Sequence, residues 1–148
     1  MKRQITLSIV LMLGVLLAGS AQTAYGQQPP PKPVADTGIV SLGQNQVLRV
    51  RVVLADFNGD ASISFKRMGY LEQDGVYKVV AQDATNPVTL KAGEGASIDI
   101  SPAFLGGVFV GVRGVVLSSS REVRVTAQII NTATGEVVAL FPNALLIP

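Results

Sequence analysis

The sequence predicts an all-β fold on three observations. Residues 121–131 alternate apolar and polar side chains, with Val123, Val125, Ala127 and Ile129 on one side, as in a strand with one buried face. Turn-forming residues recur about every 8–12 residues and separate about eight or nine short β-rich segments. No stretch after the N-terminal segment keeps a helical period. This pattern favours an antiparallel β-sandwich of immunoglobulin-like architecture.

Residues 1–26 have the build of a secretory signal peptide. Two basic residues precede an apolar run at residues 5–18, and small residues follow it. The run is too short to cross a bilayer as a helix, and the chain has no cysteine to carry a lipid anchor. We therefore expect an exported protein, periplasmic, extracellular or at the cell surface. Its mature chain should begin at Gln27, or alternatively at Gln22, and should contain no membrane span.

Removal of this segment changes the charge of the protein. The whole chain has 12 Lys and Arg against 10 Asp and Glu. Lys2 and Arg3 leave with the signal peptide, so the mature chain has as many basic as acidic residues. A net charge of zero argues against nucleic acid as a partner. Because cysteine is absent, stability has to come from packing rather than from disulfides.

The first half of the mature chain begins with a Pro-rich stretch. Residues 27–37 hold a run of prolines and predict a semi-rigid linker, because proline favours polyproline II. The β domain should then occupy residues 38–148. Its first expected strands are residues 39–42, 46–55 and 61–71, and Asn58-Gly59 predicts a hairpin turn between the last two.

The second half shows the same alternation of turns and strands. Turns are expected at Asp74-Gly75 and Thr134-Gly135 and in the serines 118–120. Residues 101–107 should form a loop with one helical turn around Pro102. The nearly continuous apolar run at 108–117 predicts a central strand covered on both faces. The other expected strands are residues 76–82, 88–90, 96–100, 121–131 and 136–141.

Three segments resemble a group of uncharacterised secreted bacterial proteins. They are residues 37–53 (TGIVSLGQNQVLRVRVV), 88–100 (VTLKAGEGASIDI) and 129–138 (IINTATGEVV), and the likeness covers roughly residues 37–140. The resemblance implies a secreted β-sandwich. It implies no activity, so no functional residue follows from it.

A calcium loop is one interpretation of Asp56, Asn58 and Asp60, which place oxygen ligands at alternate positions. An EF-hand would also need glycine at the sixth position and glutamate at the twelfth. Ala61 and Arg67 stand there instead. A polar hairpin turn explains the same residues, so we expect no metal site and keep these three as calcium candidates only.

A basic face is the second candidate site. Arg49, Arg51 and Arg124 share the outward face of two expected strands, and Arg113 is a candidate fourth member. Such a stripe could engage an anionic polymer or a lipid head group. The alternative is a solvated face that discourages edge-to-edge pairing, and the zero net charge favours it.

Catalytic chemistry has little support in the sequence. Histidine and cysteine are absent, which removes the commonest general base, the thiol nucleophile and metal sites of the His/Cys kind. The Asp and Glu residues, which could act as paired catalytic carboxylates, lie in or beside turns. The exceptions are Asp99, Glu122 and Glu136, which lie on polar strand faces. Glycines 106, 107, 111 and 114 do not have phosphate-loop spacing. We expect no enzyme and no cofactor.

The sequence thus predicts a non-catalytic secreted sandwich with a structural, adhesive or accessory role. One alternative is a small outer-membrane β-barrel, against which stands the lack of aromatic girdles. The other is a carbohydrate- or small-ligand-binding sandwich, for which Tyr70 and Tyr77 are the candidate exposed aromatic residues.

The C-terminal tail suggests a partner. Residues 144–147 are apolar and lie beyond Pro142, which should end the preceding strand. The tail should either fold back over an open edge of its own domain or add a strand to another molecule, a protein partner or a second copy. Folding back is the more common arrangement in monomers.

Overall fold

The computed structural model describes residues 29–55, 59–104, 106–141 and 145–146. Within these ranges the chain forms twelve strands and no helix. The strands are β1 (Lys32–Asp36), β2 (Gln46–Leu54), β3 (Ala61–Gln73), β4 (Val76–Ala84), β5 (Val88–Leu90), β6 (Gly95–Ile100), β7 (Ala103–Phe104), β8 (Gly107–Val108), β9 (Gly111–Ser118), β10 (Val123–Asn131), β11 (Val137–Phe141) and β12 (Leu145–Leu146). The predicted all-β class is confirmed.

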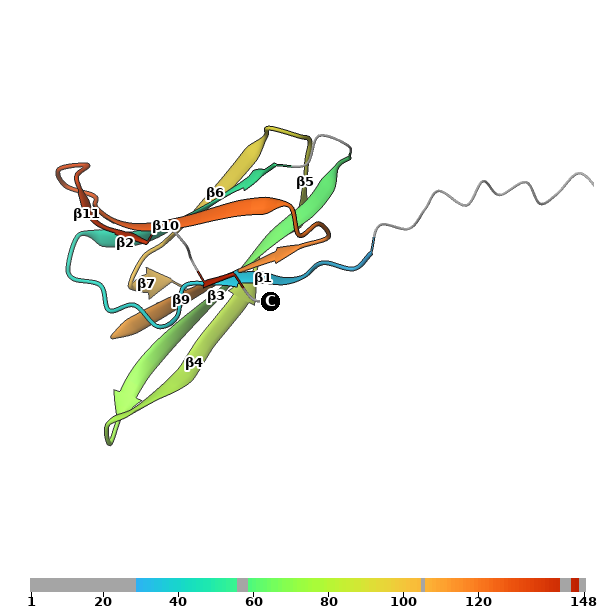
Figure 1. Cartoon of the computed structure of the whole chain (residues 1–148). Helices are drawn as coiled ribbons and strands as arrows, with labels where there is room; N and C mark the ends of the chain where they lie inside the picture. The colour runs from blue at the N-terminus through green and yellow to red at the C-terminus, as the bar shows by residue number, and fades with distance from the viewer. Residues whose placement is uncertain (1–28, 56–58, 105, 142–144, 147–148) are drawn as a thin grey trace, which may run out of the picture.

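The strands form two main antiparallel sheets (Figure 1). The first, here called the β2 sheet, has the order β11-β10-β2-β6. The second, the β3 sheet, has the order β12-β1-β9-β3-β4, and β5 also pairs with β3. Strands β7 and β8 form a separate two-stranded hairpin. Both main sheets are open, because their outermost strands pair on only one side among the described residues.

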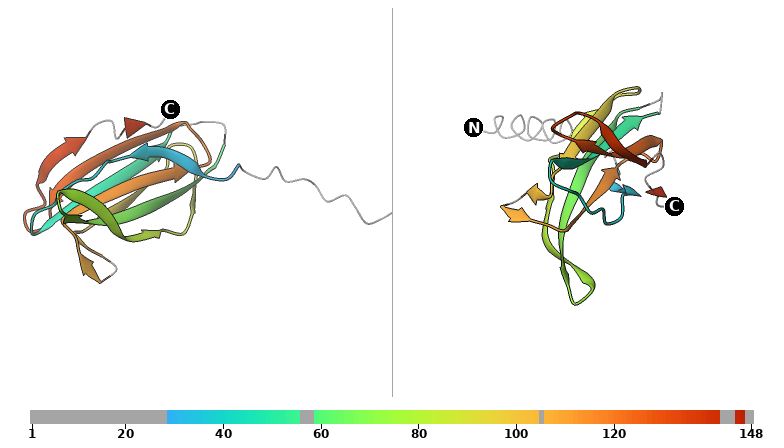
Figure 2. Two further views of the ribbon diagram at one scale, coloured as in Figure 1. Left: turned by 90° about the horizontal axis from the view of Figure 1, so that it is seen from below. Right: turned by 90° about the vertical axis from the view of Figure 1, so that its left-hand side faces the viewer.

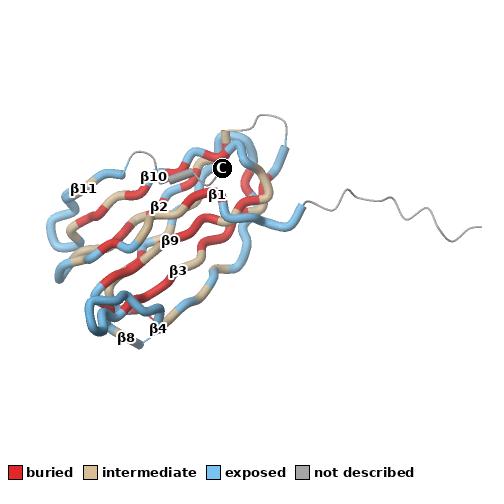
Figure 3. Tube along the Cα trace, turned by 60° about the horizontal axis from the view of Figure 1, so that its bottom comes forward, coloured by how far each residue is buried: buried red, intermediate tan, exposed pale blue. Residues whose placement is uncertain are grey.

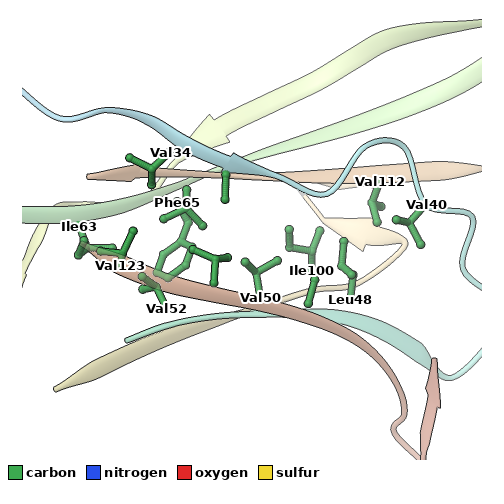
Figure 4. Packing of buried hydrophobic residues seen from close by; sticks show 14 of the residues in the cluster. Val34, Val40, Leu48, Val50, Val52, Ile63, Phe65, Ile100, Val112 and Val123 are labelled. Carbon is green, nitrogen blue, oxygen red and sulfur yellow. The ribbon is translucent and has the colours of Figure 1, made fainter. Parts of the chain in front are cut away.

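One hydrophobic cluster joins the two main sheets. Leu48, Val50 and Val52 of β2 belong to the same buried cluster as Ile63 and Phe65 of β3. Buried positions alternate with exposed or half-buried ones along β2 from Leu48 and along β10 as far as Ile129, two of the strands in the tube of Figure 3. In the close view of Figure 4 the labelled side chains of both sheets point toward one another. The core therefore lies between the sheets, where apolar side chains of both sheets are removed from water.

The strand at residues 121–131 has the predicted facing. In β10, Val123, Val125, Ala127 and Ile129 are at most 9% exposed, whereas the intervening residues are exposed or half-buried. The predicted inward face of β2 is likewise buried. Strand β9 occupies the middle of the β3 sheet and is buried on both faces, as the apolar run predicted.

We expect Ile129→Ala to lower the free energy of unfolding by about 2–5 kcal/mol, because it removes buried methyl groups and leaves a cavity. Arg124→Ala, on the opposite face of the same strand, should change it by less than about 0.5 kcal/mol. Urea unfolding of both variants checks the facing of β10. The reverse order of effects would show that the facing is wrong.

Two of the expected turns join neighbouring strands. Asp74 and Gly75 have positive φ values of 56° and 75°, as a type I′ hairpin turn requires, and they connect β3 to β4. Thr134 and Gly135 lie between β10 and β11, which pair with each other. The hairpin predicted at Asn58-Gly59 is wrong, because β2 and β3 belong to different sheets. Asn58 itself lies outside the described residues.

The structure corrects the sequence prediction in three further segments. Lys32–Asp36, inside the expected linker, is strand β1 and pairs with β9, with a bulge after Pro33 that accommodates the proline. The strand expected at residues 39–42 is reduced to a single bridge between Val40 and Val112. The helical turn expected around Pro102 is replaced by the β7–β8 hairpin.

Aromatic packing explains that hairpin. The rings of Phe104 and Phe109 lie 4.9 Å apart, and both residues belong to the main cluster. The Phe109 N–H also donates to the Pro102 carbonyl at 2.8 Å. A helical turn would not bring both rings onto the same buried surface, so long-range packing overrides the local preference of this loop.

Candidate functional site

The structure divides the predicted basic face between the two sheets. Arg49 and Arg51 lie on β2 and Arg124 on β10, whereas Arg113 lies on β9 of the β3 sheet. Arg51 pairs with Thr126 and so lies diagonally beside Arg124. The four arginines therefore do not form one stripe.

Carboxylates pair with two of these four arginines. The Arg49 guanidinium donates two hydrogen bonds to Asp99, each 2.7 Å long. Arg113 donates to Asp36 through Nε at 2.8 Å and through a second nitrogen, and it also donates to the Tyr70 hydroxyl at 3.4 Å. Both bidentate pairs connect adjacent strands, so these two arginines stabilise the sheets and are poorly placed for an anionic ligand.

The Asp36–Arg113 pair also makes stability depend on pH. The hydrogen bonds from Arg113, and one from the Gly38 amide, hold the pKa of Asp36 below its usual value although burial opposes this. A carboxylate with a lowered folded pKa stabilises the folded state above its unfolded pKa, about 3.9 for aspartate. That stability is lost as the pH falls through the folded pKa.

We therefore expect the free energy of unfolding to fall as the pH is lowered from about 5 towards the folded pKa of Asp36. In Asp36→Asn the side chain cannot titrate, so the decrease should be smaller than in the parent. Urea unfolding at a series of acidic pH values measures both proteins. Identical pH dependence would show that this pair does not contribute to acid lability.

The calcium candidates are only partly covered by the structure. Asp56 and Asn58 lie outside the described residues. Asp60 is exposed and immediately precedes β3. Within the described ranges, no group of three or more acidic residues is arranged to hold a metal ion. In the same ranges, no helix is long and apolar enough to cross a membrane.

Strand β4 forms a long, exposed sheet edge. It pairs with β3 from Lys66 to Gln73 on one side, and no described strand pairs with its other side. The β3–β4 hairpin extends beyond the rest of both sheets (Figures 1 and 2). We call the backbone and side chains of Val76–Ala84 the β4 edge.

The first half of the β4 edge exposes mostly apolar side chains, with Lys78 among them, and Gln82 and Asp83 lie near its end. Val76, Val79 and Val80 are 56%, 48% and 51% exposed, and Tyr77 is 42% exposed. Exposed apolar side chains on an unpaired strand are unusual, because such an edge can pair with another chain. Tyr70 differs from expectation, since it is 3% exposed and packs with Met68 and Val115. Of the two candidate aromatic residues, only Tyr77 is at the surface.

Side-chain contacts brace this hairpin. Arg67 of β3 forms a bidentate pair with Asp83 of β4, and its guanidinium lies 5.3 Å from the centre of the Phe104 ring. Nearer the turn, Lys78 donates to Gln73 at 2.9 Å. These contacts connect β3 and β4 both near the turn and near the body of the protein.

The described part of the C-terminal tail lies on the protein's own β3 sheet. Strand β12 pairs with β1 through Leu146 opposite Ala35 and Leu145 opposite Asp36. This arrangement matches the fold-back alternative within the chain. Exchange of the tail between molecules stays a prediction.

Sequence reasoning missed the β4 edge as a candidate site. The available signal was the pattern of residues 76–80, Val-Tyr-Lys-Val-Val. It lacks the strict apolar–polar alternation of a half-buried strand. It also follows a predicted turn and does not lie in the middle of a sheet, so its apolar residues indicate an exposed edge.

Comparisons with protein-family models, curated proteins and solved structures found no match to this chain.

Proposed function

We propose that this chain is an exported, non-catalytic binding module that holds an extended segment of a partner protein against the β4 edge. Its architecture in this proposal is an immunoglobulin-like β-sandwich with a structural, adhesive or accessory role. The single observation that carries the proposal is a nine-residue strand with exposed Val76, Tyr77, Val79 and Val80 that pairs on only one side among the described residues.

The sandwich part of the proposal rests on the shared core. Two antiparallel sheets contribute side chains to one buried cluster, which is how sandwich domains bury the inner faces of both sheets. The export part rests on residues 1–26, whose pattern is that of a secretory signal peptide.

The chemistry of a strand edge identifies the kind of partner. An edge strand presents a row of backbone N–H and C=O groups, and an extended peptide satisfies them by adding a strand to the sheet. The exposed valines and Tyr77 would contact alternate side chains of that segment. The partner segment should therefore be extended, about as long as β4, and apolar at alternate positions.

The bracing of the hairpin favours binding. Because Arg67–Asp83 and Lys78–Gln73 already connect β3 and β4, the edge needs little further ordering when a strand is added. A preorganised surface loses less conformational entropy on association.

A designed peptide tests this proposal without knowledge of the natural partner. The probe is a nine-residue peptide of alternating Thr and Val, titrated into isotope-labelled protein and followed by NMR. We expect the amide signals of Val76–Ala84 to shift. Methylation of three alternate peptide nitrogens should weaken binding more than about tenfold, because each lost hydrogen bond costs about 0.5–1.5 kcal/mol.

Two matched variants locate the binding edge. Val79→Lys places a charge on β4, and Val138→Lys places the same charge on β11, an outer strand of the other sheet. Their parent side chains are similarly exposed, 48% and 55%. Only Val79→Lys should abolish binding, because it replaces an exposed apolar side chain that the peptide is expected to contact with a charged one. The proposal would be refuted if the methylated peptide bound as tightly as the unmethylated one. It would also be refuted if only Val138→Lys lost binding. A dimer that Val79→Lys dissociates would identify a second copy of this chain as the occupant.

A further inference from the structure

A pocket of about 520 Å³ lies where the start of β1 meets the turn between β9 and β10. Lys32 at the start of β1 is paired in register with Ser118 at the end of β9. We call this cavity the serine pocket. It is lined by Pro29, Pro30, Lys32, Pro33, Val34, Ser118, Ser119, Ser120 and Arg121.

The charged lining of the serine pocket is entirely basic. Lys32 and Arg121 are both exposed, and the lining contains no Asp or Glu. Neither residue forms one of the salt bridges that neutralise Arg49, Arg67 and Arg113. Two cations without a carboxylate in the lining favour an anionic ligand.

The serine hydroxyls add hydrogen-bond donors. The Ser119 hydroxyl oxygen accepts the Ser62 N–H at 2.9 Å, and that of Ser120 accepts the Glu122 N–H at 3.1 Å. These bonds fix the position of both oxygens. A hydroxyl that accepts one bond still has its own hydrogen to donate, so both groups can donate to a ligand oxygen.

The remaining wall is apolar. Three prolines and Val34 contribute it, and Val34 is 7% exposed and belongs to the main cluster. The volume falls in the range of about 300–1,000 Å³ that is usual for small-molecule sites. An inorganic anion would leave most of this space and the apolar wall without contacts.

We infer that the serine pocket binds an organic anion of about the size of a sugar acid. The carboxylate lies between Lys32 and Arg121, and the ring packs against the proline wall. Ser119 and Ser120 donate to oxygens of the ligand. This inference does not depend on the β4 edge, which lies on a different part of the β3 sheet.

Two probes distinguish the possible sources of the anion. D-glucuronate has a hydroxylated ring, and cyclohexanecarboxylate has an apolar ring of similar size. Each is titrated into the isotope-labelled protein at low ionic strength, with D-glucose and inorganic sulfate as controls. We expect at least one carboxylate to shift the amides of Val34 and residues 118–121. It should bind about tenfold more tightly than D-glucose, which carries no charge for Lys32 and Arg121 to pair with, and about tenfold more tightly than sulfate, which leaves the apolar wall without contacts.

Matched charge variants test the assignment of the site. Lys32→Gln and Arg121→Gln should each weaken carboxylate binding about tenfold, as expected for loss of a charge-assisted hydrogen bond. Arg51→Gln removes the same charge from the outward face of the β2 sheet and should leave binding unchanged. All three parent side chains are exposed, and equal melting temperatures would show that the variants fold.

If only glucuronate binds, the result would support a sugar acid as the ligand. If only cyclohexanecarboxylate binds, the result would support an apolar carboxylate. Sulfate that binds as tightly as both carboxylates would show charge attraction only and overturn the inference. Glucose that binds equally well, or binding lost in Arg51→Gln but kept in the two pocket variants, would also overturn it. So would the absence of any shift with either carboxylate.

Discussion

Leu48→Ala is expected to lower the free energy of unfolding by about 2–5 kcal/mol. Leu48 is 0% exposed, and it is paired with Ile129 on one side and Ile100 on the other. Its side chain lies in the cluster between the two sheets, so truncation leaves a cavity that neighbouring strands cannot easily fill. Urea unfolding at neutral pH measures the change.

Leu140→Ala is the matched control, because it removes the same atoms from β11 in the same sheet. Leu140 is 60% exposed, so its truncation should change the free energy of unfolding by less than about 0.5 kcal/mol. A comparable loss of stability in both variants would show that the buried core is not where the structure has it.

Gly69→Ala should also destabilise the protein, by about 1–3 kcal/mol, through overpacking. A Cβ atom at Gly69 would lie 2.6 Å from Cδ2 and 2.7 Å from Cγ of Phe109. Phe109 is 7% exposed and packs against Phe104, so its ring has little room to move. The close approach of this ring to β3 requires glycine at this position.

Gly59→Ala provides the control, because among the described residues no heavy atom outside its chain neighbours lies within 4 Å of the added Cβ. Its effect should be small or slightly stabilising, since alanine restricts the unfolded chain. In addition, Phe109→Leu should reduce the cost of Gly69→Ala in a double-mutant cycle. Additive effects of these two substitutions would show that Phe109 is not the obstacle.

Strand positions were largely predictable from local patterns. The strands at residues 46–55, 88–90 and 121–131 were expected within a residue or two of β2, β5 and β10. Period-two alternation identifies a strand whose one face is buried. The hairpin turn at Asp74-Gly75 was predictable for a similar reason, because these two residue types accept the positive φ that the turn requires.

Strand partners were much less predictable. Asn58-Gly59 has a hairpin sequence, yet β2 pairs with β10 and β6 and not with β3. Several strands offer similar apolar faces, so the sequence alone does not choose between them. The choice depends on burial by residues distant in the chain, and the same cause places Lys32–Asp36 in a strand despite its prolines.

The candidate sites show the same division. Alternation correctly placed Arg49, Arg51 and Arg124 on polar strand positions, but Arg113 belongs to the other sheet. Its partner, Asp36, lies in the stretch predicted to be a linker. Tyr70 was expected at the surface and is buried against Met68 and Val115, because the outer face of the β3 sheet has a small apolar cluster of its own.

By itself the sequence determined that this protein is all-β, where most of its strands lie and which faces of β2 and β10 are buried. These features follow from the sequence because side-chain period and turn chemistry act over a few residues. Only the tertiary structure decided that β4 pairs on one side alone among the described strands and that three prolines, three serines and two cations line one pocket. Those features arise where segments far apart in the chain meet, and the packing of the whole fold brings them together.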